Sequence, residues 1–583
     1  MGWDYAFVHL TWTIPMGLVL GLIYWPLLTK QEIVKTGFIV SIAVVSTIPW
    51  DSYLIQHRIW TYPPDAITGL TFWGIPAEEL FFFVIQTVNT SLLYLLLSKS
   101  TFYSIYLGEA NLLHRVLGQI LLALVLVYGA ISVHVGGEGL YLGLILVWAC
   151  PFLLLIWSLT YQSLIKLPLT NTLLPIVLMT LHLWIVDTLA LRRGTWSISS
   201  GTKHGIEVVR GLDIEEAIFF FVTNILIVWG QVAFDTALAV LHTFPELFPK
   251  SNGLPGFGLL LQAILLPKAR YDKEKISGLV NAASILRRKS RSFYLASGTL
   301  EGRIRIDFIQ LYAFCRASDD LVDEATSASE ADAWIGKLRE YLRLSYEGFE
   351  DESQRATRSR LCEYVTSQFP KKYHSALLQL PTSELPREPL DDLLNGFATD
   401  VLFDQPAEFP MATTEDLDLY GRQVAGTVAE LCIRLVYLRT SQQGLAEAPR
   451  HVVNAGAQMG IALQYVNIAR DIEVDAKLGR VYIPVAWLKD QDLSAEDVIR
   501  HPSGQKVNSL RQRLLDRAFA KYEVARGAIE ELPSEARAPM RVAIESYMEI
   551  GRILRQLDYA VRPGRATVPL TRRLKVAWMA LMG

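Results

Sequence analysis

The sequence contains little charge for its length. Asp, Glu, Lys and Arg make up 19% of the 583 residues, hydrophobic residues make up 51%, and the mean hydropathy is +0.27. A net charge of −3 gives no bulk attraction for nucleic acid, so we expect no nucleic-acid partner. Most charged residues lie in 268–583, whereas 1–240 is dominated by long apolar runs. This contrast predicts a membrane half followed by a soluble half.

Other features are also scarce. No GxGxxG follows a predicted strand, which gives no support for a flavin or NAD(P) cofactor. The N-terminus has neither a basic region nor a cleavage site, so the first apolar run is predicted to be a retained span. The four cysteines lack the spacing of a metal or redox site, and we interpret them as reduced packing residues: Cys150, Cys315, Cys362 and Cys432.

Seven segments are long and apolar enough to cross a bilayer, which needs about 20 residues. None has Asp, Glu, Lys or Arg near its middle. The segments are 5–28, 34–54, 76–97, 116–135, 139–160, 172–191 and 214–238. We therefore predict a multi-pass integral membrane protein whose two chain ends lie on opposite sides of the bilayer.

The membrane half repeats itself. The segment 49–62 (PWDSYLIQHRIWTY) is similar to 185–198, and 74–84 (GIPAEELFFFV) is similar to 211–222. Matched acids and tryptophans keep a nearly constant offset of 136 or 137 residues: Asp51 with Asp187, Trp60 with Trp196, and Glu78 with Glu215. Three spans, one linking span and three more spans give both repeats the same orientation.

This topology predicts one membrane face that carries both sets of acids, namely Asp51, Glu78, Glu79, Asp187, Glu215 and Glu216. Carboxylates at span ends can also simply mark the interface or complement a helix N-terminus. Two symmetric pairs instead favour a shared catalytic site that protonates an apolar substrate. A receptor or retinal pump is the rival for seven spans, but the last span has no lysine for a Schiff base. A transporter remains open for this half alone.

Residues 242–269 contain four prolines and are predicted to link two domains, 1–241 and 270–583. After the linker, apolar residues recur at helical spacing with almost no strand alternation. The fold class is therefore predicted as all-α, with the seven-span domain followed by a helical domain around an apolar cavity.

Two acidic stretches stand out in the soluble half. Asp319 and Asp323 are spaced i, i+4, as are Asp471 and Asp475, so each pair lies on one helix face. Facing carboxylates of this kind suit Mg²⁺ ions that also bind substrate phosphates. Either stretch alone could be an ordinary solvated helix end.

These stretches belong to four motifs, RKSRSFYLAS (288–297), YAFCRASDDLVDE (312–324), YGRQVAGTVAEL (420–431) and LQYVNIARDIEVDAKLGRVYIP (463–484). With them, residues 271–583 resemble the phytoene/squalene synthase family. The resemblance implies head-to-head condensation of two geranylgeranyl diphosphates on Mg²⁺, with Mn²⁺ as an alternative. It implies metal binding by Asp319, Asp320, Asp323, Asp471 and Asp475, supported by Glu324. It also implies diphosphate or substrate contacts from Arg291, Phe293, Tyr294, Arg316, Gly426, Thr427, Gln464, Asn467, Arg470, Lys477 and Arg480.

The membrane half resembles the integral-membrane lycopene cyclases, in which each three-span unit carries a Pro-x-Glu-Glu motif. The first unit matches at Pro76–Glu79, whereas the second has Asp213 in place of the proline. The fusion order is similar to that of fungal bifunctional carotenoid enzymes. It implies lycopene as second substrate, a phytoene desaturase as working partner, and an endomembrane location such as the endoplasmic reticulum. The Lys and Arg residues of the loops do not decide how the membrane half is oriented in the bilayer. The orientation follows only if the synthase half is placed in the cytosol. A squalene-synthase-like activity with a membrane anchor or transporter is the alternative.

Overall fold

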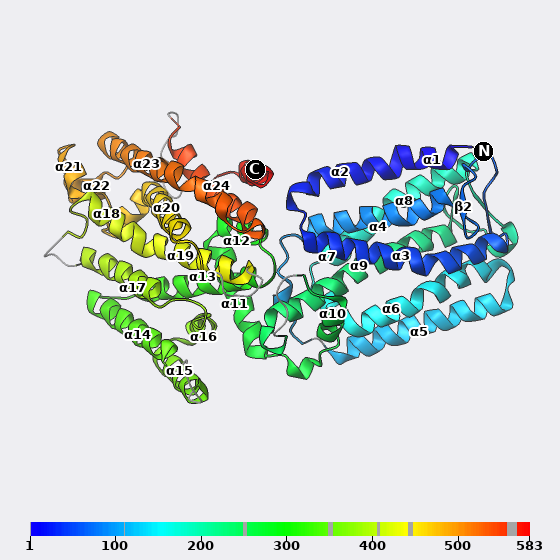
Figure 1. Cartoon of the computed structure of the whole chain (residues 1–583), viewed down its shortest axis with the longest axis horizontal. Helices are drawn as coiled ribbons and strands as arrows, with labels where there is room; N and C mark the ends of the chain where they lie inside the picture. The colour runs from blue at the N-terminus through cyan, green and yellow to red at the C-terminus, as the bar shows by residue number, and fades with distance from the viewer. Residues whose placement is uncertain are drawn as a thin grey trace. The chain divides into compact units, whose positions relative to one another are not determined.

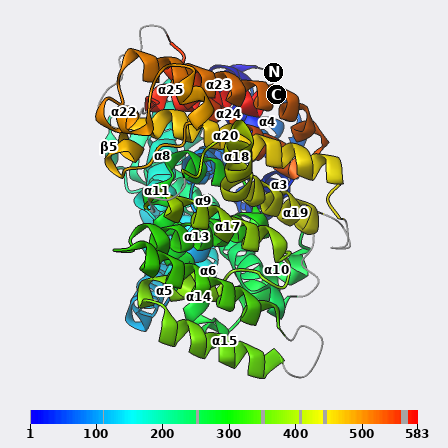
Figure 2. The ribbon, with the colours of Figure 1, turned by 90° about the vertical axis from the view of Figure 1, so that its left-hand side faces the viewer.

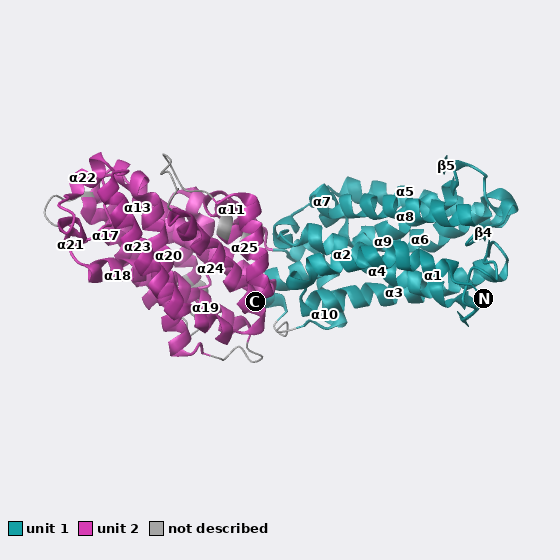
Figure 3. Cartoon of the chain, turned by 90° about the horizontal axis from the view of Figure 1, so that it is seen from above, with its two compact units in different colours: residues 1–271 teal, residues 272–583 magenta. Residues whose placement is uncertain are grey.

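The computed structural model describes residues 2–109, 111–248, 254–347, 354–404, 409–440, 447–556 and 568–583. The chain divides into a first unit, Met1–Tyr271, and a second unit, Asp272–Gly583 (Figure 3). Both units are built from helices, as predicted. The described strands are two or three residues long and all lie in the first unit.

Seven described helices of the first unit are long and apolar enough to cross a membrane, which confirms the predicted spans. The first of these is interrupted by a π-helical turn, His9–Thr13. The α-helices of this unit are α1 (Asp4–Val8), α2 (Ile14–Tyr24), α3 (Lys30–Gln56), α4 (Ala77–Ser98), α5 (Leu112–Val135), α6 (Leu140–Lys166), α7 (Leu169–Thr172), α8 (Leu174–Arg193), α9 (Ile214–Thr243) and α10 (Phe257–Ile264). The first of the seven long helices combines α1 and α2, the sixth combines α7 and α8, and α10 is not among the seven.

The internal repeat is visible in the loops at one end of this bundle (Figure 1). The strands are β1 (Trp60–Thr61), β2 (Thr71–Phe72), β3 (Ile75–Pro76), β4 (Ser197–Ile198), β5 (Glu207–Val209) and β6 (Leu212–Asp213). In both repeats a hairpin, β2–β3 or β5–β6, leads directly into a helix that carries Glu-Glu. Each hairpin turns at a glycine with positive φ, Gly74 (81°) and Gly211 (87°), a conformation that other residues rarely adopt.

The two repeats also contact each other through equivalent residues. Strand β1 pairs with β4, and the Thr61 and Ser197 hydroxyls, which occupy equivalent positions, lie 2.8 Å apart. Deeper in the bundle, Gln86 of α4 donates to Thr223 of α9 over 3.0 Å. Because these contacts join equivalent residues, the repeats are related by an approximate two-fold axis between α4 and α9.

The predicted linker, 242–269, lies within the first unit in the structure. Its amphipathic helix α10 packs against α9 near the end of the bundle opposite the short strands (Figure 1). Phe257 of α10 stacks on Phe38 of α3 with ring centroids 4.4 Å apart. The apolar part of this segment is therefore a wall of the helical bundle.

The second unit consists of fifteen described α-helices. They are α11 (Lys273–Lys289), α12 (Arg291–Ser297), α13 (Gly302–Asp323), α14 (Ala328–Tyr346), α15 (Gln354–Gln368), α16 (His374–Leu378), α17 (Glu388–Val401), α18 (Thr414–Gly421), α19 (Thr427–Thr440), α20 (Arg450–Lys477), α21 (Val485–Lys489), α22 (Ala495–Arg500), α23 (Gln505–Ala525), α24 (Ser534–Leu554) and α25 (Leu570–Met582). Side-chain caps begin several of them; Thr413, for example, forms a capping box with Asp416.

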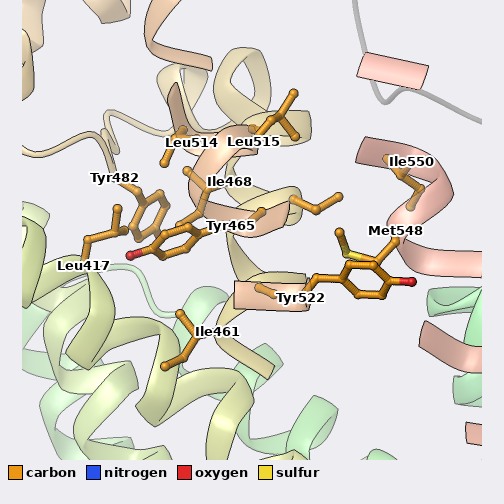
Figure 4. Packing of buried hydrophobic residues seen from close by; sticks show 14 of the residues in the cluster. Leu417, Ile461, Tyr465, Ile468, Tyr482, Leu514, Leu515, Tyr522, Met548 and Ile550 are labelled. Atoms are coloured by element: carbon orange, nitrogen blue, oxygen red, sulfur yellow. The ribbon is translucent and has the colours of Figure 1, made fainter. Parts of the chain in front are cut away.

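Helix α20 is the centre of the second unit and packs against α18, α19, α23 and α24 (Figure 2). Its buried face includes Tyr465 and Ile468, which lie among the side chains of Leu514 and Leu515 from α23 (Figure 4). A helix that is covered on several sides is held firmly. The carboxylates near its C-terminal end are therefore positioned by the core itself.

Two candidate active sites

Four carboxyl groups meet at one end of the first unit. Asp51 comes from α3, Glu79 from α4, Asp187 from α8 and Glu216 from α9, and none is more than 1% exposed. Asp187 interacts electrostatically with both Glu79 and Glu216, and Asp51 interacts with Glu79. We call these four residues the carboxylate cluster. It combines both repeats, as the sequence predicts.

Tyrosine and tryptophan supply the hydrogen bonds to the cluster. Glu79 accepts from the hydroxyls of Tyr5 and Tyr62, the latter over 2.8 Å. Glu216 accepts from Tyr141 over 2.6 Å, and Asp187 accepts from the Trp196 indole over 3.2 Å. All of these donors are neutral. Tyr62 has no equivalent in the second repeat, where Ile198 occupies its place, so the two halves of the cluster differ.

Several oxygens of the cluster have no hydrogen-bond partner among the described residues. They include both oxygens of Asp51 and one each of Glu79, Asp187 and Glu216. Within the described chain, no lysine or arginine pairs with any of the four. Burying four negative charges without a cation would be very unfavourable. The arrangement therefore suits carboxyl groups that hold and transfer protons.

The other glutamate of each pair has a different position. Glu78 accepts from the Thr68 backbone N–H over 2.8 Å, and Glu215 accepts from the His204 N–H over 2.8 Å and from its Nδ1 over 2.7 Å. Thr68 and His204 are again 136 residues apart. Glu78 and Glu215 thus hold the loop before each helix, whereas Glu79 and Glu216 face the cluster.

Asp213 replaces the proline of the second motif without changing the backbone. Its dihedrals, φ −67° and ψ 148°, match those of Pro76, φ −58° and ψ 143°, and both residues stand just before their helix. The Asp213 carboxylate also pairs with Lys203 over 2.5 Å. The two Glu-Glu pairs therefore begin their helices in the same way.

Aromatic rings surround the cluster. Trp50 stacks on Phe219 at 5.4 Å between ring centroids, and Phe82 meets Phe220 edge-on at 6.1 Å. Ring faces stabilise cations without reacting with them. Tyr5 and Tyr141, which were not predicted as site residues, are 136 residues apart, so the repeat offset itself was the signal that could have found them.

The second unit brings its two acidic motifs together. Arg480, just beyond α20, donates to Asp323 of α13 over 2.9 Å, which joins motifs 157 residues apart. Arg316 pairs with Asp319 over 2.6 Å and also with Asp320. Arg470 pairs with Asp471 over 2.5 Å. Every one of these aspartates has a basic partner, in contrast to the carboxylate cluster.

A further carboxylate, Asp400 of α17, was not predicted from the sequence. It is 6% exposed and accepts from Tyr482 over 2.8 Å and from Tyr420 over 3.3 Å. Burial raises the pKa of Asp400 to about 6, against a lowering effect of Arg480. Both tyrosines lie in the quoted motifs, but no spacing rule connects them with Asp400.

Asp400 interacts with both acidic motifs. Burial, together with repulsion from nearby Asp323 and Asp400, raises the pKa of Asp319 to about 7. Burial likewise raises the pKa of Asp475 to about 7, and Asp471 and Asp400 contribute. We call these residues the aspartate site: Asp319, Asp320, Asp323, Asp400, Asp471 and Asp475. Their mutual repulsion is the condition that a bound cation relieves.

The donor set fits a divalent metal. It offers only hard carboxylate oxygens, which Mg²⁺ and Mn²⁺ prefer. In the part of the chain that the structure describes, no three such side chains converge on one point, because arginines occupy several of the oxygens. Metal binding would therefore exchange arginine partners for the cation.

The remaining predicted residues of the second unit lie in different surroundings. Asn467 lies beside the site, where it accepts from Tyr547 and donates to Gln464 over 3.2 Å. Phe293 packs on Tyr312 with ring centroids 5.5 Å apart, next to Tyr294. Lys477 is exposed, and Glu324 pairs with Lys372 over 2.8 Å. The side chain of Arg291 lies outside the described residues.

Gly426 ends a π-helical turn, Arg422–Gly426, and Thr427 begins α19. A Cβ atom at Gly426 would lie 3.2 Å from the Ala457 carbonyl oxygen of α20, and one at Gly460 would lie 2.6 Å from the Ala425 oxygen. The small residues therefore let this turn cross α20 closely. Close packing accounts for Gly426 by itself.

Comparison with known proteins identifies the family of the chain. Residues 286–572 match the family model of squalene/phytoene synthases. A bifunctional lycopene cyclase/phytoene synthase of Gibberella fujikuroi is 59% identical over 582 residues, with 100% of both chains covered. One of Leptosphaeria maculans is 54% identical over 588 residues, also with 100% of both covered. A solved dehydrosqualene synthase covers 52% of this chain and 95% of its own, at 22% identity and a TM-score of 0.40. The chain therefore belongs to the family of bifunctional lycopene cyclase/phytoene synthases.

Proposed function

We propose that the second unit condenses two geranylgeranyl diphosphates to phytoene and that the first unit cyclises lycopene to γ- and β-carotene. The observation that carries this proposal is the contrast between two acidic sites in one chain. One is buried, and its hydrogen-bond donors in the described part of the chain are neutral; arginines pair with the aspartates of the other. The first arrangement suits proton transfer, and the second suits a diphosphate and its metal.

In the second unit, the aspartate site would hold Mg²⁺, which neutralises the diphosphate as it leaves. Arg316, Arg470 and Arg480 lie within reach of the same anion and orient it. One prenyl cation is attacked by the double bond of the other substrate, and loss of a proton from the resulting cation closes the three-membered ring of a cyclopropyl diphosphate. A second ionisation, rearrangement and loss of a proton then give phytoene.

In the first unit, a carboxylic acid of the cluster adds a proton to the terminal double bond of lycopene. The neighbouring double bond attacks the resulting cation and closes a six-membered ring. A carboxylate then removes a ring proton, so the reaction is an isomerisation that consumes no reductant or oxidant. We assign Glu79 and Glu216 to these transfers, because they face the cluster.

A desaturase must act between the two steps, because lycopene has more double bonds than phytoene. Phytoene and lycopene are both hydrocarbons, so both dissolve in the bilayer and can pass through it between the desaturase and this chain. We place the chain in an endomembrane such as the endoplasmic reticulum, with the second unit in the cytosol where soluble diphosphates are found. Seven apolar helices support a membrane location.

The test is product analysis in a bacterium that makes geranylgeranyl diphosphate and carries a phytoene desaturase. The intact chain should give cyclic carotenes, Asp471→Ala should give no carotenoid, and Glu79→Gln should accumulate lycopene. Phytoene without any ring from the intact chain would remove the cyclase assignment. Squalene formed with added NADPH, and no carotenoid, would remove the phytoene assignment.

A further inference from the structure

An apolar groove of about 540 Å³ runs through the first unit between α3, α4, α6, α9 and α10. It is distinct from the carboxylate cluster but leads to it. On three helices a lining residue stands one turn from a cluster carboxylate: Thr47 and Asp51 on α3, Phe83 and Glu79 on α4, and Phe219 and Glu216 on α9. This end of the groove therefore lies within about one helical turn of the carboxylate cluster.

The groove is long and has a defined far end. Its lining on α9 extends from Phe219 to Ala237, which is about 27 Å at about 1.5 Å per residue. This length is close to the ~30 Å thickness of a hydrocarbon core. Phe38 and Phe257, stacked on each other, lie at the far end, where α10 forms part of the wall.

The polar side chains among the described residues that line the groove each make a hydrogen bond within the protein. Ser46 and Thr47 donate to the Ala43 carbonyl, Thr87 to that of Phe83, Gln86 to Thr223, and Thr223 to the Phe219 carbonyl. The Trp148 indole donates to the Ser46 carbonyl over 3.1 Å. A polar ligand would lose its own hydrogen bonds here, so the groove selects a hydrocarbon chain.

We propose that this groove binds the linear polyene lengthwise, with one end group at the carboxylate cluster and the rest of the chain extending toward α10. The proposal rests on the proposed cyclase function and adds its binding site. One groove holds one end group at a time. A symmetric polyene must therefore leave and re-enter in the opposite direction to receive a second ring, with its first ring at the far end.

Ala233→Phe tests the middle of the groove, because Ala233 lines it on α9 more than four helical turns from Glu216 of the carboxylate cluster. In lycopene-producing bacteria we expect this variant to form at least about 10-fold less cyclic carotene while phytoene synthesis is unchanged. Ala123→Phe on the exposed face of α5 is the matched control and should behave as the intact chain. Equal cyclisation by Ala233→Phe and the intact chain would overturn the proposal.

Binding can be measured separately from turnover. Lycopene should co-purify with the Glu79→Gln chain and be reduced at least about fivefold in Glu79→Gln/Ala233→Phe. Equal lycopene in the two proteins, or phospholipid displaced by the phenylalanine instead of lycopene, would contradict the assignment. The binding measurement also separates the groove proposal from the proposed cyclase function. If the intact chain binds lycopene in the groove but never forms a ring, the binding site stands and the cyclase function is wrong.

The direction of entry has its own test at the far end. Leu261 of α10 lines the groove, and Leu261→Trp narrows the space in which the first ring must lie. We expect the ratio of monocyclic to bicyclic product to rise at least about threefold, because a ring is bulkier than an open end group. An unchanged ratio, with the total rate lowered or not, would overturn the end-over-end scheme.

Discussion

The chain contains two acidic sites, and they differ in what surrounds the carboxylates. In the first unit, the carboxylate cluster is no more than 1% exposed, and among the described residues its hydrogen-bond donors are tyrosine and tryptophan. In the second unit, the aspartate site is partly exposed, and Arg316, Arg470 and Arg480 pair with its members. The same side-chain chemistry is thus placed in an apolar and in a cationic environment.

The difference shows that the surroundings of an acidic residue decide its use. A carboxyl group without a cation is most stable with its proton, so it can act as an acid toward a hydrocarbon. A carboxylate among arginines stays available as a ligand, and the arginines attract a substrate anion. Proton transfer by the carboxylate cluster and metal binding by the aspartate site should therefore respond differently to the same change.

Removing divalent metal should have the largest effect. With a chelator in excess, we expect phytoene synthesis by isolated membranes to stop, because the aspartate site would lose the cation that neutralises diphosphate. Cyclisation of supplied lycopene should continue at its original rate. Radiolabelled geranylgeranyl diphosphate and supplied lycopene, assayed on one membrane preparation, give both rates. Equal loss of both activities would break the comparison.

Glu216→Gln should reduce cyclisation by about 100-fold or more, because a general acid or base contributes about 10²–10⁴. Phytoene synthesis should be unchanged. Glu215→Gln is the matched control, since an amide oxygen can still accept from the His204 N–H. Its loss should be much smaller. A larger loss in Glu215→Gln than in Glu216→Gln would reverse the assignment within the pair.

Asp400→Asn should reduce phytoene synthesis by about 10-fold to 100-fold and raise the metal concentration required for half-maximal rate. The reason is that Asp400 interacts with both acidic motifs and would no longer add charge to the metal site. Asp391→Asn on the same helix is the control, because Asp391 pairs with Arg387 at the surface. A lower rate with an unchanged metal dependence would make Asp400 a packing residue.

Tyr62→Phe should have the smallest effect, about threefold to 10-fold on cyclisation, because Glu79 would lose one of its two phenol donors. Tyr141→Phe should cost more, since Tyr141 donates the one phenol hydrogen bond described for Glu216. Initial rates with supplied lycopene compare the two variants. Equal effects would show that the asymmetry between the repeats has no catalytic consequence.

The sequence by itself determined the architecture. The lengths of the apolar segments predict the seven spans, because a helix needs about 20 apolar residues to cross a bilayer. The offset of 136 or 137 residues predicts the repeat, and the i, i+4 aspartates predict two acidic helix faces. The helical periodicity of the second half and its motifs predict the all-α domain and its family. Each of these properties depends on residues that are close in the chain or related by one fixed offset.

Only the tertiary structure decided which side chains meet. Spacing shows which residues share a face of one helix but not which faces of different helices are opposed. For that reason the sequence could not choose Glu79 over Glu78, connect Tyr5 with Glu79, or place Asp400 between two motifs. The groove near the cluster has the same origin, because α3, α4, α6, α9 and α10 enclose it only when they pack together.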